Sequence, residues 1–154
     1  MTAKIDVLKA VIKHWSERQD VDAVLEHLSD GLVWHFSAVT QPAVHGKAGA
    51  RKFLEGFKNR VKNPRWRIFR IAETDDALFV EGADEFETPD GTTVVIPYMG
   101  ILDFDGDLII GWRDYFDRGI ADDGVAGKGL PDHAADLISR EALPGLGAPE
   151  KVAA

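Results

Sequence analysis

The sequence predicts an α+β domain in which helices pack on one face of a curved β-sheet. Two observations lead to this fold class. Apolar residues recur at helical spacing in most of the first 61 residues, whereas from residue 65 to residue 116 they alternate with polar residues, as in half-buried strands. Short runs of Gly, Pro and Asp separate the alternating segments and favour turns. Helices therefore come first, followed by a meander of strands.

Three helical segments precede most of the predicted sheet. Residues 5–28 form either two helices or one helix broken near Gln19, and the motif SDG supplies the stop signal. The motif LVWHF at residues 32–36 is a short strand, which a loop connects to the third helix. That helix is predicted for residues 47–61 because four apolar side chains share one of its faces, namely Phe53, Leu54, Phe57 and Val61.

Four further strands are predicted at residues 65–73, 77–87, 93–104 and 108–117. The motifs TPDGT and DGD place turn residues between the last three strands, which therefore form two hairpins. Beyond them Gly, Pro and Ala dominate, apart from a predicted helix at residues 131–141. We expect a single domain at residues 1–142 and a flexible tail at residues 143–154.

Composition and charge narrow the function classes. The chain has 154 residues and a net charge of −8, which argues against a nucleic-acid partner. Nine of its eighteen basic residues nevertheless lie between Lys47 and Arg70, with Glu55 as the only acid there. We interpret that segment as a solvated helix end followed by a strand with Arg on its outer face. No run is apolar enough to span a membrane, the first residues lack the apolar stretch of a signal peptide, and Cys is absent, so we expect a cytoplasmic protein.

Two strands place an ionisable acid on their apolar face. Side chains alternate between the two faces of a strand. In LIIGWRDYFD, Asp114 therefore shares a face with Trp112 and Phe116, and in ALFVEGADEFE, Asp84 shares a face with Val80. A single buried Asp is commonly satisfied by backbone N–H groups or by an Arg, but two on adjacent hairpins favour a pocket.

Hairpin register predicts that the two acids lie beside one tyrosine. Pairing across the second hairpin is expected to place Asp114 opposite Tyr98, and in the first hairpin Asp84 lies opposite Ile96 or Tyr98. Asp84, Tyr98 and Asp114 then form a row across three strands, with the outer carboxylates roughly 10 Å apart. Two nearby carboxylates push their pKa values apart, which gives one ionised base and one protonated acid. Such a pair suits proton transfer to both ends of a substrate.

The remaining candidate groups flank the first strand. Among the five His, His35 is a candidate pocket residue: strand alternation points it away from Trp34 and Phe36, but a bulge would reverse this. Trp34 and Phe36 belong either to the core or to the lining of a pocket. No His spacing matches a metal site, no Cys is present and no dinucleotide or phosphate motif occurs, so we expect no metal and no cofactor.

The order of helices and strands, the segment VHGKAGARKFLEGF and above all the motif GWRDYFD resemble the limonene-1,2-epoxide hydrolase branch of the SnoaL-like, NTF2-like superfamily. The similarity covers most of residues 1–120. It implies a cone-shaped fold, in which a strongly curved mixed sheet and N-terminal helices enclose a deep apolar pocket. It also implies a homodimer formed through the sheet, for which the strand at residues 65–71 is a candidate face.

In these epoxide hydrolases one Asp deprotonates a water, a second Asp protonates the epoxide oxygen, and an Arg bridges the two. The resemblance places the water-activating Asp at Asp114 and the acid at Asp84. The bridging Arg corresponds here to Gly82, and the Tyr and Asn that hold the water correspond to Trp34 and Phe36. Both carboxylates remain, while their counter-charge and the groups that position the water are missing, and this loss affects hydrolysis more than proton transfer.

These residues lead to three hypotheses. The leading one is a cofactor-free lyase or isomerase for a small hydrophobic, aromatic or terpenoid-like substrate, with Asp114 as base and Asp84 or Tyr98 as acid; elimination, dehydration or retro-aldol cleavage would suit these groups. The second is epoxide hydrolysis by the same Asp pair, with His35 or Tyr98 in place of the lost water-binding groups. The third is a non-catalytic ligand-binding or interaction module. The predicted pocket lining is Trp34, Phe36, Val80, Ile96, Trp112 and Phe116.

Overall fold

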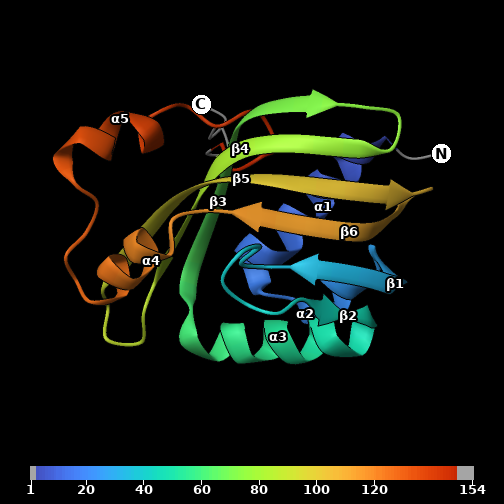
Figure 1. Ribbon diagram of the computed structural model, residues 1–154, viewed down its shortest axis with the longest axis horizontal. Helices are drawn as coiled ribbons and strands as arrows, with labels where there is room; N and C mark the ends of the chain where they lie inside the picture. Colours follow the sequence, from blue (N-terminus) through green and yellow to red (C-terminus); the bar gives the residue numbers. More distant parts are fainter. Residues whose placement is uncertain (1–2, 149–154) are drawn as a thin grey trace, which may run out of the picture.

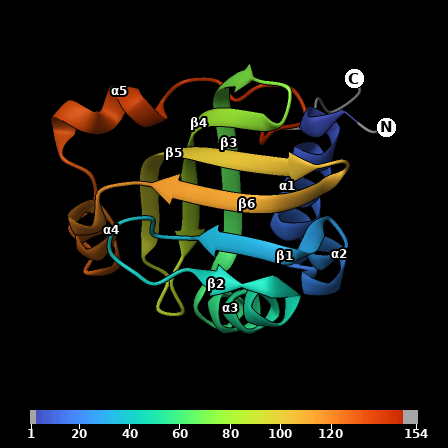
Figure 2. The ribbon, with the colours of Figure 1, turned by 45° about the vertical axis from the view of Figure 1, so that its right-hand side comes forward.

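One six-stranded sheet organises residues 3–148, the part of the chain that the computed structural model describes (Figure 1). In spatial order its strands are β2 (Val44–His45), β1 (Leu28–His35), β6 (Leu108–Tyr115), β5 (Thr93–Asp105), β4 (Ala77–Glu87) and β3 (Lys62–Glu73). Strands β1 and β6 run parallel, and the other neighbours run antiparallel. In Figure 2, β3 crosses behind β5 and β6 at a steep angle, so the sheet is strongly curved. The predicted α+β fold with a curved mixed sheet is confirmed.

Three helices pack on one face of the sheet: α1 (Lys4–Arg18), α2 (Val21–Leu25) and α3 (Gly46–Arg60). The alternative that the sequence left open is resolved, because Gln19 adopts a left-handed conformation (φ 47°) that ends α1. The Asp20 carboxylate then accepts a hydrogen bond from the backbone N–H of Ala23 at 3.1 Å and caps α2. After the sheet come α4 (Arg118–Val125), a short 3-10 turn (Asp132–Ala134) and α5 (Ala135–Ile138).

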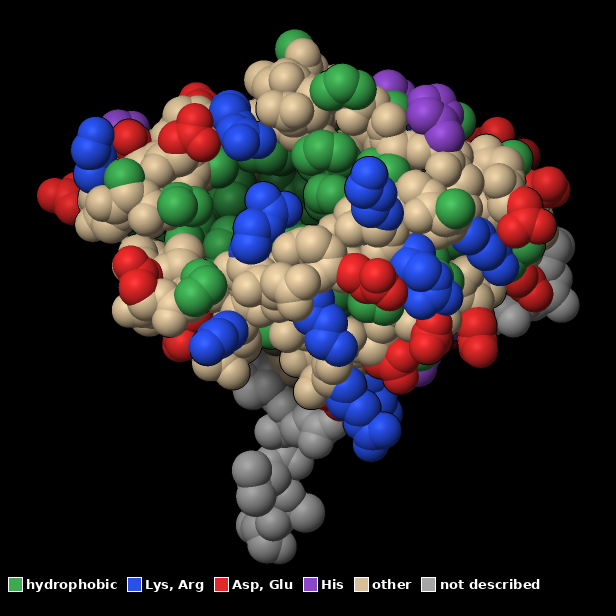
Figure 3. Space-filling model, turned by 90° about the horizontal axis from the view of Figure 1, so that it is seen from below, with side chains coloured by type: hydrophobic (Ala, Val, Ile, Leu, Met, Phe, Trp, Pro, Cys, Tyr) green, Lys and Arg blue, Asp and Glu red, His purple; other side chains and the backbone are tan. Residues whose placement is uncertain are grey.

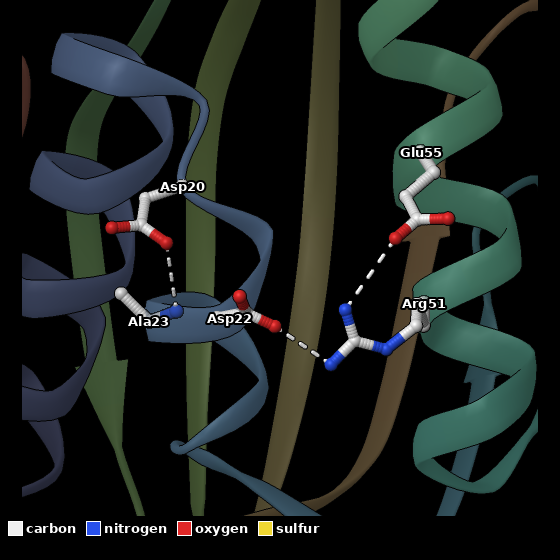
Figure 4. A network of polar contacts seen from close by, with 5 residues as sticks. All are labelled: Asp20, Asp22, Ala23, Arg51 and Glu55. Atoms are coloured by element: carbon white, nitrogen blue, oxygen red, sulfur yellow. Dashed lines mark hydrogen bonds and ion pairs between the residues drawn. The ribbon is translucent and has the colours of Figure 1, made fainter.

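An ion-pair network connects α2 to α3. Arg51 donates a hydrogen bond to Asp22 at 2.7 Å and another to Glu55 at 3.4 Å (Figure 4). All three side chains are largely exposed, so these pairs add little to the free energy of unfolding. They fix α3 beside α2, and α3 forms one wall of the cavity described below.

The main core lies between α1 and the concave face of the sheet. The buried side of α1 has the helical period that the sequence predicts and comprises Val7, Leu8, Val11, Ile12 and Trp15. It packs against sheet residues such as Ile68, Leu78 and Leu102, which are completely buried. A second, smaller cluster lies where α4 meets β5; there Gly124 approaches so closely that a Cβ would lie 2.8 Å from Val94 Cγ1.

The register of the first hairpin matches one of the two expected pairings, whereas that of the second is wrong. Asp84 lies opposite Ile96, but Asp114 lies opposite Gly100 instead of Tyr98. The cause is a bulge between the pairs at Asp103 and Phe104, which leaves Ile110 without a partner across the ladder. The side chains before the bulge therefore lie on the opposite face of the sheet from the expected one. Ile110, which was expected on the buried face, is exposed.

Residues 143–148 of the predicted flexible tail pack against β3. Leu143 donates a backbone hydrogen bond to Ile68 at 2.8 Å, and Ile68 donates one to Leu146 at 2.9 Å. Leu146 is buried, and a Cβ on Gly147 would lie 2.3 Å from the carbonyl oxygen of Trp66. This segment extends the free edge of β3, which satisfies backbone groups that an edge strand exposes. Residues 149–154 of the predicted tail lie outside the described residues. Among residues 3–148, no helix is long and apolar enough to cross a membrane.

Candidate active site

A cavity of about 960 Å³ is enclosed by the concave face of the sheet together with α1, α3 and α4. Figure 3 shows a hollow filled with hydrophobic side chains and bordered by Lys and Arg. Five residues of the predicted lining form part of its wall, namely Trp34, Phe36, Ile96, Trp112 and Phe116. The wall is strongly aromatic beyond this set, because α1, α3, β3 and β4 also contribute Trp15, Phe53, Phe57, Trp66 and Phe86.

Two predicted site residues lie elsewhere. His35 is not brought to the cavity, because it lies on the opposite face of β1 from Trp34, beside Arg113 of β6. The register irregularity of β1 falls before Val33 and so does not reverse the alternation at His35. Val80 lies in the core behind the cavity wall and is 1% exposed. Neither residue is retained as a candidate for contact with a ligand.

Asp84, Tyr98 and Asp114 all line the cavity, but on a diagonal across the sheet instead of in a row. Asp84 lies opposite Ile96, Tyr98 lies opposite Gly82, and Asp114 lies opposite Gly100. Each step along the diagonal advances by two residues. The first step is the regular register of β4 with β5, and the second arises because the bulge at Ile110 displaces β6 relative to β5. All three side chains still reach one compartment, since residues two apart on a strand share a face.

Two glycines make room for this group of side chains. A Cβ on Gly100 would lie 2.8 Å from Asp114 Oδ1, so the Asp114 carboxyl occupies the space above Gly100. A Cβ on Gly82 would lie 2.2 Å from the carbonyl oxygen of Arg67 and 3.2 Å from the Tyr98 ring. The backbone of β3 therefore excludes any side chain at Gly82, including the bridging Arg that the resemblance places there.

Burial dominates the electrostatics of the two acids. It raises the pKa of Asp84 from 3.8 to about 7. Burial also raises the pKa of Asp114 from 3.8 to about 8, and the charge on Asp84 adds to this rise. The repulsion is a property of the pair, so it acts on whichever carboxyl loses its proton second. The pair therefore holds about one proton near neutral pH.

Indole N–H groups partly replace the missing counter-charge. Trp112 Nε1 donates a hydrogen bond to Asp114 Oδ1 at 3.2 Å, which opposes the rise in the pKa of Asp114. Trp34 stacks on Trp112 at 4.5 Å between ring centroids and also lowers the pKa of Asp114. Its buried Nε1 nevertheless forms no well-aligned hydrogen bond with a described residue. No hydrogen bond is found between Asp84 and any described residue, so of the two carboxyl groups Asp114 alone has an indole donor.

Tyr98 is held as a neutral hydroxyl. Burial raises its pKa well above 10, and the charges on Asp114 and Asp84 add to this rise. Trp66 Nε1 donates a hydrogen bond to the Tyr98 hydroxyl oxygen, which leaves the hydroxyl hydrogen available to an acceptor in the cavity. Trp66 stacks in turn on Trp112, with ring centroids 5.7 Å apart. Trp66 is not among the residues predicted for the pocket, although its two-residue spacing from the buried Ile68 indicates the same inner face.

Among the described residues, no group of three or more His, Cys, Asp or Glu is placed to hold a metal ion. The acids of the cavity are Asp84, Asp114 and Asp122, and its cations are Arg60 and Arg118. The chemistry that these groups support is therefore general acid–base chemistry by carboxyl and phenol groups.

Comparison with known families identifies the family of this chain. The SnoaL-like domain family matches residues 8–112, which is most of the helices and sheet described above. The chain belongs to the SnoaL-like family. The resemblance seen in the sequence is thereby confirmed at the level of the family, and the NTF2-like fold is confirmed with it.

Solved structures place this SnoaL-like protein among several kinds of relative. An LEH-like epoxide hydrolase from M. tuberculosis is 25% identical, with a TM-score of 0.69 over 80% of this chain and 89% of that one. A chain from Shewanella putrefaciens named as a SnoaL-like polyketide cyclase is 15% identical, with a TM-score of 0.72 over 82% and 98%. A protein with a ketosteroid isomerase-like fold from Catenulispora acidiphila, bound to trimethylamine, is 15% identical, with a TM-score of 0.70 over 84% of this chain and 96% of that one. No curated protein sequence matches the chain.

Proposed function

We propose that this SnoaL-like protein is a cofactor-independent acid–base enzyme, a lyase or isomerase. The observation that carries the proposal is the Asp84–Asp114 pair, whose pKa values lie near 7 and near 8 inside an apolar cavity. Groups that hold about one proton between them at neutral pH can give and take protons without a metal. Perturbed pKa values in a cleft also favour a functional site over a structural one.

The proposed roles follow from the hydrogen bonds. Asp114 is the base, because the indole N–H of Trp112 stabilises its carboxylate form. Asp84 takes the role of acid, which the resemblance to the epoxide hydrolases assigns to its position, and with a pKa of about 7 part of the molecules carry its proton at neutral pH. In an elimination, Asp114 would take a proton from carbon while Asp84 or Tyr98 protonates the departing oxygen. The products leave the pair with its protons exchanged, and solvent restores the starting state.

The wall of the cavity indicates the substrate class. Its aromatic side chains offer a large apolar surface, and neither Lys nor His is among the lining residues in the described range 3–148. A small hydrophobic substrate, aromatic or terpenoid-like, with an oxygen function near the Asp pair would match this wall. Dehydration and retro-aldol cleavage are the reaction types that such an oxygen function permits.

The test measures removal of a proton from carbon. The α-protons of 2-tetralone in D₂O are followed by ¹H NMR, and we expect wild-type protein to accelerate their exchange. Asp114→Asn should lower the enzymatic rate by at least about 100-fold, the range for loss of a general base, while 2-tetralone still binds. Exchange at the wild-type rate in Asp114→Asn would show that Asp114 is not the base. Binding without exchange in either protein would leave a non-catalytic ligand-binding module.

Epoxide hydrolysis is the second candidate, favoured by the similarity to the M. tuberculosis epoxide hydrolase and by the two Asp positions that the resemblance of the sequence implies. Against it, Gly82 provides no bridging guanidinium and the backbone around it excludes one. Incubation with lipophilic epoxides in ¹⁸O-labelled water distinguishes the two candidates. Label in a diol product supports hydrolysis, whereas unlabelled epoxide together with α-proton exchange supports the leading candidate.

We further propose that the protein is a homodimer. The strand segment at residues 65–71 is not free for this role, because Arg67 donates a hydrogen bond to the carbonyl of Ile138 at 2.7 Å and Arg140 covers the Phe69 ring at 4.7 Å. The outer face of β4, β5 and β6 is open instead. It exposes Phe79, Met99 and Tyr115, which the ladder places on adjacent strands. Exposed large apolar side chains that lie together favour a protein interface.

A further inference from the structure

The charged residues of the cavity are divided between its floor and its rim. Asp84 and Asp114 lie on the sheet and are surrounded by protein. Arg60, Arg118 and Asp122 come from the end of α3 and from α4, and all three are exposed. An anionic group at the floor would be repelled by the carboxylates and would lose its hydration. The rim is the part of the cavity where an anion can bind.

Within the described part of the chain, Arg60 is the rim cation without an ion-pair partner. Arg118 forms an ion pair with Asp122 at 3.2 Å within α4. Arg60 donates a hydrogen bond from Nε to the carbonyl oxygen of Gly56 at 3.2 Å and forms no ion pair with any residue in the described range 3–148. Its two terminal nitrogens remain free to bind two oxygens of one acid group.

The C-terminal end of α3 explains why basic residues occur there, but it does not explain why Arg60 lines the cavity. Lys58 and Arg60 both lie in the last turn of α3, where cations are favourable beside the helix C-terminus. Of the two, Arg60 lines the cavity and Lys58 does not. Figure 3 shows the consequence at the surface, where blue side chains border the hydrophobic hollow. Lys58 therefore provides a control for the charge of the helix end.

We infer that the ligand of this cavity is an amphiphile, with an apolar aromatic body on the sheet floor and an anionic oxygen group held at the rim by Arg60. The inference rests on the proposed function and adds an anionic group at one end of the proposed substrate. The anion anchors the molecule at the mouth, and the uncharged end is thereby directed toward Asp84 and Asp114. Carboxylate, sulfonate and phosphate groups share the chemistry that the guanidinium recognises.

The test uses two fluorescent probes that differ by one anionic group: 1-anilinonaphthalene-8-sulfonate and its uncharged counterpart N-phenyl-1-naphthylamine. We expect Arg60→Gln to weaken binding of the sulfonate about tenfold, as for loss of a charged hydrogen bond, and to leave the uncharged probe within twofold of wild type. Lys58→Gln, which removes the same charge from the same helical turn, should leave both affinities within twofold. The uncharged probe should displace the sulfonate, which places both in one cavity.

Three outcomes would overturn the inference: an unchanged sulfonate affinity in Arg60→Gln, an equal loss for both probes, or an equal loss in Lys58→Gln. Competition of the uncharged probe by 2-naphthoate and by 2-naphthyl phosphate then shows which acid group is preferred. These measurements concern binding alone. A failure of Asp114 as a base would change the exchange assay and leave the probe affinities as they are, so the two proposals fail separately.

Discussion

At the scale of single residues, the two acids of the cavity differ in their hydrogen-bond donors. Asp114 has an indole N–H donor from Trp112 and a second indole, Trp34, beside it. Asp84 has burial without a donor. Indole N–H groups carry no net charge, so they stabilise a carboxylate without fixing it in the ionised form as an Arg would. The result is a pair that titrates near neutral pH.

The raised pKa values make a prediction about stability. Because Asp84 and Asp114 have pKa values of about 7 and about 8 in the folded protein, against 3.8 when unperturbed, the folded state binds more protons between these values. The free energy of unfolding therefore falls as pH rises through that range. Between pH 5 and pH 9, we expect the free energy of unfolding of Asp84→Asn to fall by about 2–4 kcal/mol less than that of wild type.

Urea denaturation at several pH values measures this difference. Asp75→Asn, at an exposed position in the turn between β3 and β4, is the control and should keep the wild-type dependence on pH. A parallel decline of Asp84→Asn and wild type would show that Asp84 is ionised at little cost in the folded protein.

At the scale of secondary-structure elements, the pairing of β3 with β4 determines what can stand beside the acids. The register of this pair shifts between Ile68 and Arg70, so that β3 bends where it passes Gly82. The carbonyl oxygen of Arg67 then occupies the space of a side chain. The departure from the epoxide hydrolase pattern at Gly82 is thus a property of two strands and not of one substitution.

We expect Gly82→Ala to destabilise the protein by about 1–3 kcal/mol, the range for overpacking of a buried site. The reason is that its Cβ would lie 2.2 Å from a backbone oxygen that belongs to the β3 ladder. Thermal and urea unfolding measure the effect. Gly56→Ala is the matched control: it lies in α3 with nothing within 4 Å of its Cβ, and it should stabilise the helix by about 0.5–1 kcal/mol. Equal stabilities of Gly82→Ala and wild type would mean that β3 can move away.

The elements also show what the sequence could and could not predict. The shared face of Asp84, Tyr98 and Asp114 was predictable because a two-residue period holds locally in each strand. Their diagonal arrangement was not, because LII at residues 108–110 is apolar throughout and contains no signal for the bulge at Ile110. The packing of residues 143–148 was hidden for another reason: a segment that adds to a sheet edge is held by backbone hydrogen bonds, which side-chain patterns do not reveal.

At the scale of the whole molecule, the two faces of the sheet differ in what they present. The concave face bears the cavity, and the outer face exposes apolar side chains between β4 and β6, where Phe79 pairs with Ile101 and Met99 pairs with Tyr115. The C-terminal segment covers β3 on the same side and so limits the open surface to the middle strands. A second copy of the chain would bury this surface without obstructing the mouth of the cavity.

Met99 is 54% exposed in the middle of this outer face, which makes it the position to disrupt. If the face joins two protomers, Met99→Glu buries a carboxylate in the interface, and desolvation of that charge should shift the protein from dimer to monomer. Analytical ultracentrifugation at micromolar concentration measures the change. Val39→Glu introduces the same charge at a loop position that is 85% exposed and should leave the dimer intact. A wild-type protein that sediments as a monomer, or a Met99→Glu variant that remains dimeric, would exclude this face as the interface.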